Sequence, residues 1–151
     1  MKIIYVHHGE RVKGEDDITE LGTQDACLVA KILDKNHIKE SVKAIFTASH
    51  FRCKKTAEII NQTFNVSVFE DNRLNEFVDN PNETWLSAQA RITNCIDNII
   101  EKFDENDAVV CVTSGVNVAA FISKVYGLEP SEKTPYLGIP SCSLIIFDYQ
   151  K

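Results

Sequence analysis

Hydrophobic residues follow two different spacings in alternate segments of the 151-residue chain. Short runs of β-branched and aromatic residues predict strands, whereas apolar residues spaced three and four positions apart predict helices. The predicted strands cover residues 2–6, 43–47, 66–69, 108–112 and 144–147. The predicted helices cover residues 24–33, 51–64 and 116–126, together with a long helix whose apolar stripe is Trp85, Ala88, Ile92, Ile96, Ile99 and Phe103.

This alternation of strands and helices predicts an α/β fold with a three-layer architecture, in which helices cover both faces of a mostly parallel central sheet. Residues 108–112 ("AVVCV") are continuously apolar, as expected for a strand that is covered on both faces. Asn82 is the predicted N-cap of the long helix, and Gly127 is the predicted C-terminal cap of the helix over residues 116–126. Residues 129–140 are interpreted as one long connection, so we expect a single domain over residues 1–151.

Composition and charge narrow the range of partners. The net charge of −6 disfavours nucleic acid as a ligand, because phosphate backbones are bound by basic surfaces. No apolar stretch approaches the roughly 20 residues of a membrane helix, and the N-terminal apolar run is too short for a signal peptide. The five cysteines are odd in number, widely spaced and without a CxxC pair, which favours free thiols. We therefore expect a cytoplasmic protein that binds neither membranes nor nucleic acid.

Polar residues follow several of the predicted strands. Since ligands of such sheets bind beyond the carboxyl ends of the strands, these residues are the candidates for a site. They are His7, His8, Gly9 and Glu10, then Ser49, His50 and Arg52, then Arg73 and Glu76, and finally Thr113, Ser114 and Gly115. A neutral imidazole can accept a phosphoryl group, a cation can stabilise the phosphoryl oxygens, and an acid can protonate the leaving group. His8, Arg52 and Glu76 would fill these roles, and Gly9 would allow the backbone to approach the phosphate.

Other chemistries fit the same residues less well. A metal pair of His7 and His8 is disfavoured, because adjacent strand residues point to opposite faces and no third ligand is evident. The sequence "TSG" at residues 113–115 lacks the G-x-S-x-G pattern of a nucleophilic serine. The acidic run "GEDD" at residues 14–17 is interpreted as a solvated loop.

Six segments in order resemble the histidine phosphatase superfamily, which has the phosphoglycerate-mutase-like fold. They are "VHHGE", "DITELGTQDACLVAKIL", "FTASHFRCKKTAEII", "DNRLNEF", "VVCVTSGVNVAAFI" and "IPSCSLIIFDY". The resemblance implies that His8 is the nucleophile, that Arg52 binds phosphate and that Glu76 is the general acid. It further implies that Gly9 and Gly115 lie at the phosphate and that no metal or organic cofactor is needed.

Two positions depart from the family pattern. His7 stands where the family has its first arginine, and Ser114 stands where the family has its second histidine. A protonated His7 could donate to a phosphoryl oxygen, but imidazolium cannot form the bidentate fork of a guanidinium. Ser114 could donate one hydroxyl hydrogen bond, and the helix that follows it could contribute backbone N–H groups. The predicted pocket is therefore a weakened anion site.

Two functions remain open at this point. The first is hydrolysis of phosphomonoesters through a phosphohistidine on His8, with mutase activity less favoured because the span from His8 to Leu21 is short. The second is a catalytically weakened or inactive protein that binds a phosphorylated ligand or a protein partner. In either case the expected ligand is a phosphorylated small molecule or phosphoprotein, with phosphate or another oxyanion in the pocket.

Overall fold

The computed structural model describes residues 1–36, 38–76, 82–129 and 139–149. Its centre is a five-stranded sheet with the strand order β3-β2-β4-β1-β5. The strands are β1 (Lys2–His7), β2 (Val42–Thr47), β3 (Ser67–Glu70), β4 (Ala108–Thr113) and β5 (Leu144–Asp148). The pairs β1–β4, β2–β4 and β2–β3 are parallel, whereas β5 runs antiparallel to β1 at one edge. The predicted mostly parallel sheet is confirmed.

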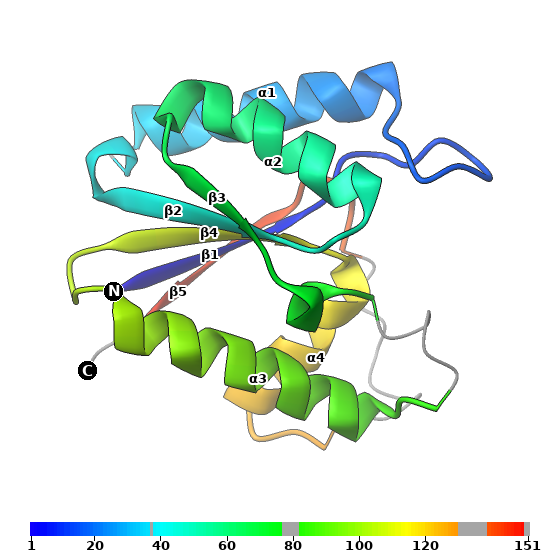
Figure 1. Cartoon of the computed structure of the whole chain (residues 1–151), viewed down its shortest axis with the longest axis vertical. Helices are drawn as coiled ribbons and strands as arrows, with labels where there is room; N and C mark the ends of the chain where they lie inside the picture. Colours follow the sequence, from blue (N-terminus) through cyan, green and yellow to red (C-terminus); the bar gives the residue numbers. More distant parts are fainter. Residues whose placement is uncertain (37, 77–81, 130–138, 150–151) are drawn as a thin grey trace.

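Two helices cover each face of the sheet (Figure 1). α1 (Glu20–Lys35) and α2 (Phe51–Phe64) lie on one face, and α3 (Trp85–Lys102) and α4 (Gly115–Val125) lie on the other. Short 3-10 turns, η1 (Lys39–Ser41) and η2 (Asn72–Leu74), precede β2 and follow β3. The predicted helices are present, and that over residues 51–64 has the expected bounds.

Burial of the helical stripes explains why these segments are helical. The stripe residues Ile92, Ile96 and Ile99 of α3 are buried in the main core, and Ala88 is buried against Val116 of α4. All six residues of β4 are buried as well, because helices cover both of its faces. Within the described residues, no helix is both long enough and apolar enough to cross a membrane.

One helix end differs from the prediction, and another is confirmed. Thr84, and not Asn82, is the N-cap of α3, and it forms a reciprocal capping box with Ser87. Gly127 terminates α4 as predicted: it has a positive φ of 65°, its N–H donates to the carbonyl of Lys124, and the N–H of Leu128 donates to that of Ser123, which is a Schellman motif. Most of the predicted connection 129–140 lies outside the described residues.

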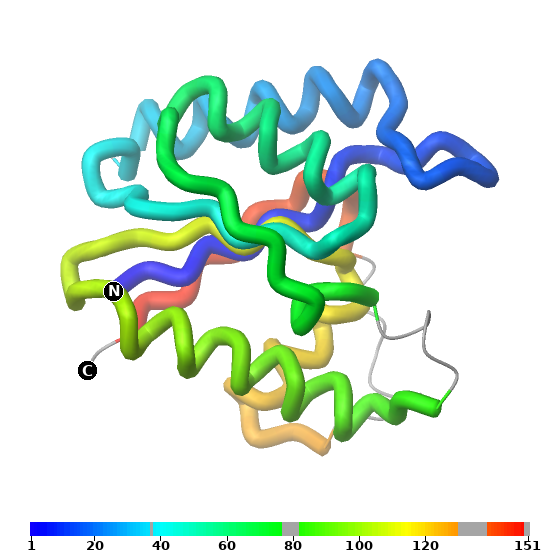
Figure 2. The backbone as a smooth tube through the Cα atoms, in the orientation of Figure 1, coloured from blue at the N-terminus to red at the C-terminus, as the bar shows by residue number. Residues whose placement is uncertain are grey.

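The two ends of the described chain lie side by side (Figure 2). The N-terminal ammonium of Met1 donates to the carbonyl of Tyr149 at 2.8 Å, beside the β1–β5 pair. At the opposite end of β1 the chain enters the loop that begins with His8, and β2 and β4 end at the same edge of the sheet. This edge holds the candidate site.

Candidate active site

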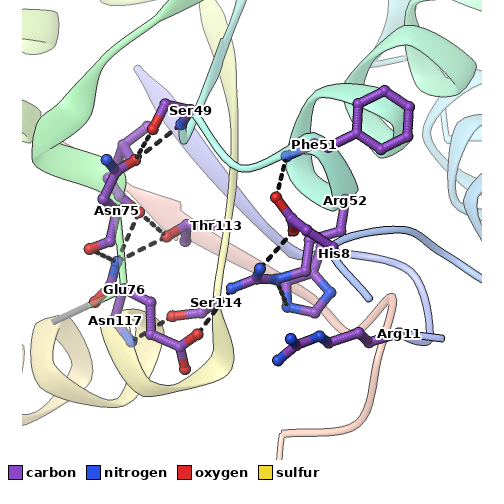
Figure 3. Close-up of polar contacts among 12 residues, drawn as sticks. His8, Arg11, Ser49, Phe51, Arg52, Asn75, Glu76, Thr113, Ser114 and Asn117 are labelled. Atoms are coloured by element: carbon purple, nitrogen blue, oxygen red, sulfur yellow. Dashed lines mark hydrogen bonds and ion pairs between the residues drawn. The ribbon is translucent and has the colours of Figure 1, made fainter. Parts of the chain in front are cut away.

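The candidate residues come from loops and helix starts at the carboxyl ends of three parallel strands. His8 follows β1, Arg52 lies in the first turn of α2 after β2, and Ser114 follows β4. Glu76 follows η2, and Figure 3 shows its carboxylate on the same side as the Arg52 guanidinium. The structure therefore brings together the nucleophile, cation and acid that the sequence predicts.

His8 is held in one tautomer. Its Nδ1 lies 2.8 Å from the carbonyl oxygen of Gly9, and since a carbonyl can only accept, Nδ1 must carry the proton. Its Nε2 is then unprotonated and accepts a hydrogen bond from Arg52 Nε at 3.1 Å (Figure 3). The residue is only 7% exposed.

Burial also keeps His8 uncharged. Desolvation of the ring lowers the pKa of His8 from 6.5 to about 4. The nearby His7, Arg52 and His50 lower the pKa further, whereas the hydrogen bond to Gly9 opposes them. At neutral pH the ring is therefore a neutral imidazole with its lone pair on Nε2, which is the form a nucleophile needs.

Arg52 is engaged on all three of its nitrogen atoms. Besides the Nε bond to His8, Nη1 donates to Asp16 at 2.6 Å and Nη2 donates to Glu76 at 2.9 Å. The guanidinium is buried, and these carboxylates offset the cost of burying its charge. A phosphate that binds Arg52 must therefore replace at least one of these partners.

Asp16 is a site residue that the sequence interpretation missed. The acidic run 14–17 was expected to be a solvated loop, but one Asp16 oxygen accepts from Arg52 and the other accepts from the Phe51 N–H at 2.8 Å. The carboxylate thus sits on the N-terminus of α2, where an anion is favoured. Its side chain is still 44% exposed. No local pattern indicates this contact, because Asp16 and Arg52 are 36 residues apart.

Hydrogen bonds between side chains and the backbone position the segment that ends in Glu76. Asn117 Nδ2 donates to the carbonyls of Leu74 and Asn75 at 2.7 and 2.8 Å. Thr113 Oγ1 also donates to Leu74, at 2.6 Å, and the side chain of Asn75 accepts from the Ser49 N–H (Figure 3). The ends of β4 and β2 and the first turn of α4 therefore fix this segment against the sheet.

His7 is held by the backbone in this structure. Its Nδ1 is bound to the carbonyls of Ile139 and Pro140 at 2.8 and 3.1 Å, so this atom donates to the backbone. Burial lowers its pKa, despite these two hydrogen bonds that raise it. The ring packs edge-on against that of His8, with centroids 4.5 Å apart. The expectation that the two rings point to opposite faces is wrong, because β1 ends at His7 and His8 already belongs to the loop.

Ser114 and Gly115 begin α4. Ser114 is 3% exposed and is the N-cap, its hydroxyl accepting from the Asn117 N–H at 3.5 Å. It thus stabilises the start of the helix from a buried position. A Cβ on Gly115 would lie 3.1 Å from the His7 ring, so a side chain here would press on that ring.

Gly9 has a packing reason to be glycine. A Cβ at this position would lie 2.8 Å from the carbonyl oxygen of Gly22 in α1. The Gly9 N–H donates to Thr56 Oγ1 at 3.0 Å, and Thr56 donates in turn to the carbonyl of Arg52. Gly9 therefore lets the nucleophile loop lie close to α1 and ties it to α2, which is a different role from a close approach to phosphate.

The charges of the described site sum to a negative value. Asp16 and Glu76 each contribute one negative charge against the single positive charge of Arg52, and the lowered pKa values of His7 and His8 leave both rings neutral at pH 7. Among the described residues, no group of three His, Cys, Asp or Glu side chains is arranged to hold a metal ion.

Comparison with known proteins places this site in a known fold. The family model of the histidine phosphatase superfamily (branch 1) matches residues 77–151. The match covers α3, β4, α4 and β5, whereas His8, Arg52 and Glu76 lie before it. No curated protein sequence matches the chain at a significant level.

Solved structures match over nearly the whole chain. A mycobacterial glucosyl-3-phosphoglycerate phosphatase in complex with VO3 has a TM-score of 0.76 and 20% identity, covering 96% of this chain and 90% of its own. A mutant phosphoserine phosphatase from Entamoeba histolytica in complex with phosphoserine has a TM-score of 0.78 and 18% identity, covering 99% and 91%. YhfR of Bacillus stearothermophilus has a TM-score of 0.76 and 21% identity, covering 96% and 89%. At these identities the similarity establishes the shared fold. Together with the family match over residues 77–151, it supports membership of the histidine phosphatase superfamily.

Proposed function

We propose that this protein hydrolyses phosphomonoesters through a phosphohistidine on His8. The observation that carries the proposal is the state of His8, whose Nδ1–H is fixed by Gly9 and whose Nε2 lone pair faces Arg52. A neutral imidazole with a defined free nitrogen is a competent nucleophile across the physiological pH range. Two structures of the same fold have a phosphorylated compound or a vanadium oxyanion bound, which supports an oxyanion site.

The reaction has two balanced steps. In the first, the phosphoryl oxygens displace both Asp16 and His8 Nε2 from Arg52, and the released Nε2 lone pair forms a bond to phosphorus as the ester P–O bond breaks. The Glu76 carboxylate takes up the proton that the phosphomonoester monoanion brings into the site, passes it to the departing alkoxide and is a carboxylate again when the bond has broken. In the second step, water attacks the phosphohistidine, Glu76 takes the proton from that water, and inorganic phosphate leaves with His8 restored.

Arg52 and the α2 N-terminus would stabilise the transferred group. The Arg52 guanidinium offers a bidentate contact, and the Phe51 N–H offers a donor once Asp16 moves away. Because the Asp16 side chain is already partly exposed, water can solvate its carboxylate when phosphate displaces it from Arg52. Such preorganised donors supply much of the stabilisation in phosphoryl transfer.

A second function is favoured by the charge of the site. With Arg52 paired to two carboxylates and His7 tied to the backbone, the resting site is a weak receptor for a dianion. A protein with this arrangement could bind phosphorylated ligands and turn them over slowly or not at all. The difference between the two functions is whether His8 becomes phosphorylated.

The test is hydrolysis of an aryl phosphate between pH 5 and 7 by the wild-type protein and by His8→Asn, which keeps a polar side chain of similar size. Hydrolysis that is lost in the variant, with an acid-labile phosphohistidine trapped in the wild type, supports the hydrolase. Wild-type protein that is stabilised by orthovanadate but never phosphorylated supports the binding function. Hydrolysis that persists in His8→Asn contradicts the proposed mechanism.

A further inference from the structure

The phosphate site as described lacks sufficient positive charge. A phosphomonoester arriving as a dianion would meet a net charge of −1 from Asp16, Glu76 and Arg52. His7, which replaces the family's arginine, donates its Nδ1–H to backbone carbonyls, and burial lowers its pKa, so it contributes no positive charge in the resting protein at pH 7. A phosphate site of this kind needs another cation that can contact the phosphoryl oxygens.

Three of the four arginines are committed to other partners. Arg52 is bound by His8 and two carboxylates, as described above. Arg73 is paired with Asp71 and also donates to side chains of α3, whereas Arg91 is paired with Glu83. Two lysines of α2 are engaged as well: Lys54 pairs with Glu70 and Lys55 with Asp17.

Arg11 differs from these cations. It lies three residues after His8 in an exposed loop, and its backbone forms an isolated bridge with Ile18 that fixes the loop. Its Nε donates to the backbone carbonyl of Glu15 at 2.7 Å, while the neighbouring Glu10 carboxylate is turned to Thr19 at the start of α1. Within the part of the chain that the structure describes, both terminal guanidinium nitrogens of Arg11 have no recorded partner.

The direction of the Arg11 side chain completes the argument. Figure 3 shows its guanidinium extending from the loop toward the space bordered by His8, Arg52 and Glu76. We propose that Arg11 is the second phosphate-binding guanidinium of this site and takes over, from the loop after β1, the role of the arginine that is missing at position 7. The inference rests on the proposed phosphate site, but it does not require that phosphate is turned over. With Arg11 included, the net charge around the phosphoryl group rises from −1 to zero.

This assignment predicts a direct contact to phosphoryl oxygens and not merely a favourable field. Lys13 provides the matched control, because it is an exposed cation of the same loop and has no recorded ion pair in the described structure. Orthovanadate is the probe, since it presents only oxyanion oxygens and needs no leaving group. Its dissociation constant is measured by titration calorimetry for wild type, Arg11→Gln, Arg11→Lys and Lys13→Gln.

We expect Arg11→Gln to weaken vanadate binding at least tenfold, as for loss of a charge-assisted hydrogen bond. Arg11→Lys should fall between that variant and the wild type, because lysine retains the charge without the fork. Lys13→Gln should change the constant less than about threefold, since it alters the same net charge at a screened distance. Equal melting temperatures of the two glutamine variants without vanadate would exclude loop unfolding as the cause.

Equal weakening in Arg11→Gln and Lys13→Gln would overturn the assignment, because a long-range field alone would then explain it. An unchanged constant in Arg11→Gln, or no vanadate binding by the wild type, would overturn it as well. The aryl phosphate assay separates this inference from the proposed function. Hydrolysis that depends on His8 but not on Arg11 refutes only the Arg11 assignment, whereas Arg11-dependent vanadate binding without phosphohistidine refutes only the hydrolase.

Discussion

The buried, uncharged state of His8 links the stability of the protein to pH. The pKa of this residue is about 4 in the folded protein and 6.5 in its reference state. Between these values the unfolded chain binds a proton that the folded chain does not, so unfolding is favoured progressively as the pH falls. The contribution of His8 is fully present above pH 6.5 and is lost as the pH falls from 6.5 to 4.

The magnitude follows from the difference between the two pKa values. A difference of about 2.5 units corresponds to roughly 3 kcal/mol in total, of which about 2 kcal/mol is lost by pH 4.5. The His8→Asn variant lacks the titrating group. Between pH 7 and 4.5 the free energy of unfolding should therefore decrease in both proteins, but by about 2 kcal/mol less in the variant than in the wild type. His7, whose pKa is also lowered, contributes in the same direction in both proteins.

The measurement is urea-induced unfolding of both proteins at several pH values from 7 to 4.5, followed by circular dichroism. The pKa values of Asp16 and Asp71 are lowered below 3.8, so most of their titration falls outside this window. Parallel stability curves, differing by less than about 0.5 kcal/mol in their pH dependence, would refute the reasoning. In the active protein the same pKa places the acid limb that His8 imposes on turnover near pH 4, well below the usual range of histidine.

Three further substitutions test how the site is built. Asp16→Asn should tighten orthovanadate binding roughly tenfold at low salt, because it removes the negative charge that pairs with Arg52 and keeps an oxygen acceptor for the Phe51 N–H. Weaker binding in calorimetry would contradict the displacement step. Asn117→Ala should lower the free energy of unfolding by about 2–4 kcal/mol and reduce kcat, because it breaks the buried hydrogen bonds that hold the segment ending in Glu76. Unchanged urea denaturation and turnover would show that this network is dispensable. Gly9→Ala should destabilise the protein by about 1–3 kcal/mol, measured by thermal unfolding, because its methyl group would meet the backbone of α1, and wild-type stability would mean that the helix yields easily.

The sequence pattern was sufficient for the fold. Apolar periodicity located the five strands and four α-helices of the described residues, and the burial of residues such as Ile92 and Ile96 is what that periodicity reflects. The cap of α3 was misplaced by two residues because Asn82 and Thr84 are both good capping residues, and the reciprocal bond to Ser87 decides between them. Local patterns therefore determine which elements form, and side-chain pairing determines where they end.

The site was only partly predictable. Motif order placed His8, Arg52 and Glu76 together, because strand ends of a parallel sheet meet at one edge. The contact of Asp16 with Arg52 was not predictable, since it depends on how one loop folds across the start of a distant helix. The attachment of His7 to the backbone was missed for a similar reason, because the carbonyls that accept from it come from the far end of the chain.

The position of β1 within the sheet has a consequence for how the protein is made. β1 carries His7 and leads into His8, yet its two hydrogen-bonding neighbours are β4 and β5, which end at Thr113 and Asp148. A nascent chain that has reached the end of α3 contains the nucleophile, its arginine and its acid, but neither strand that holds β1 in place. During synthesis, β1 therefore cannot pair with either of its neighbouring strands until the last third of the chain has been made.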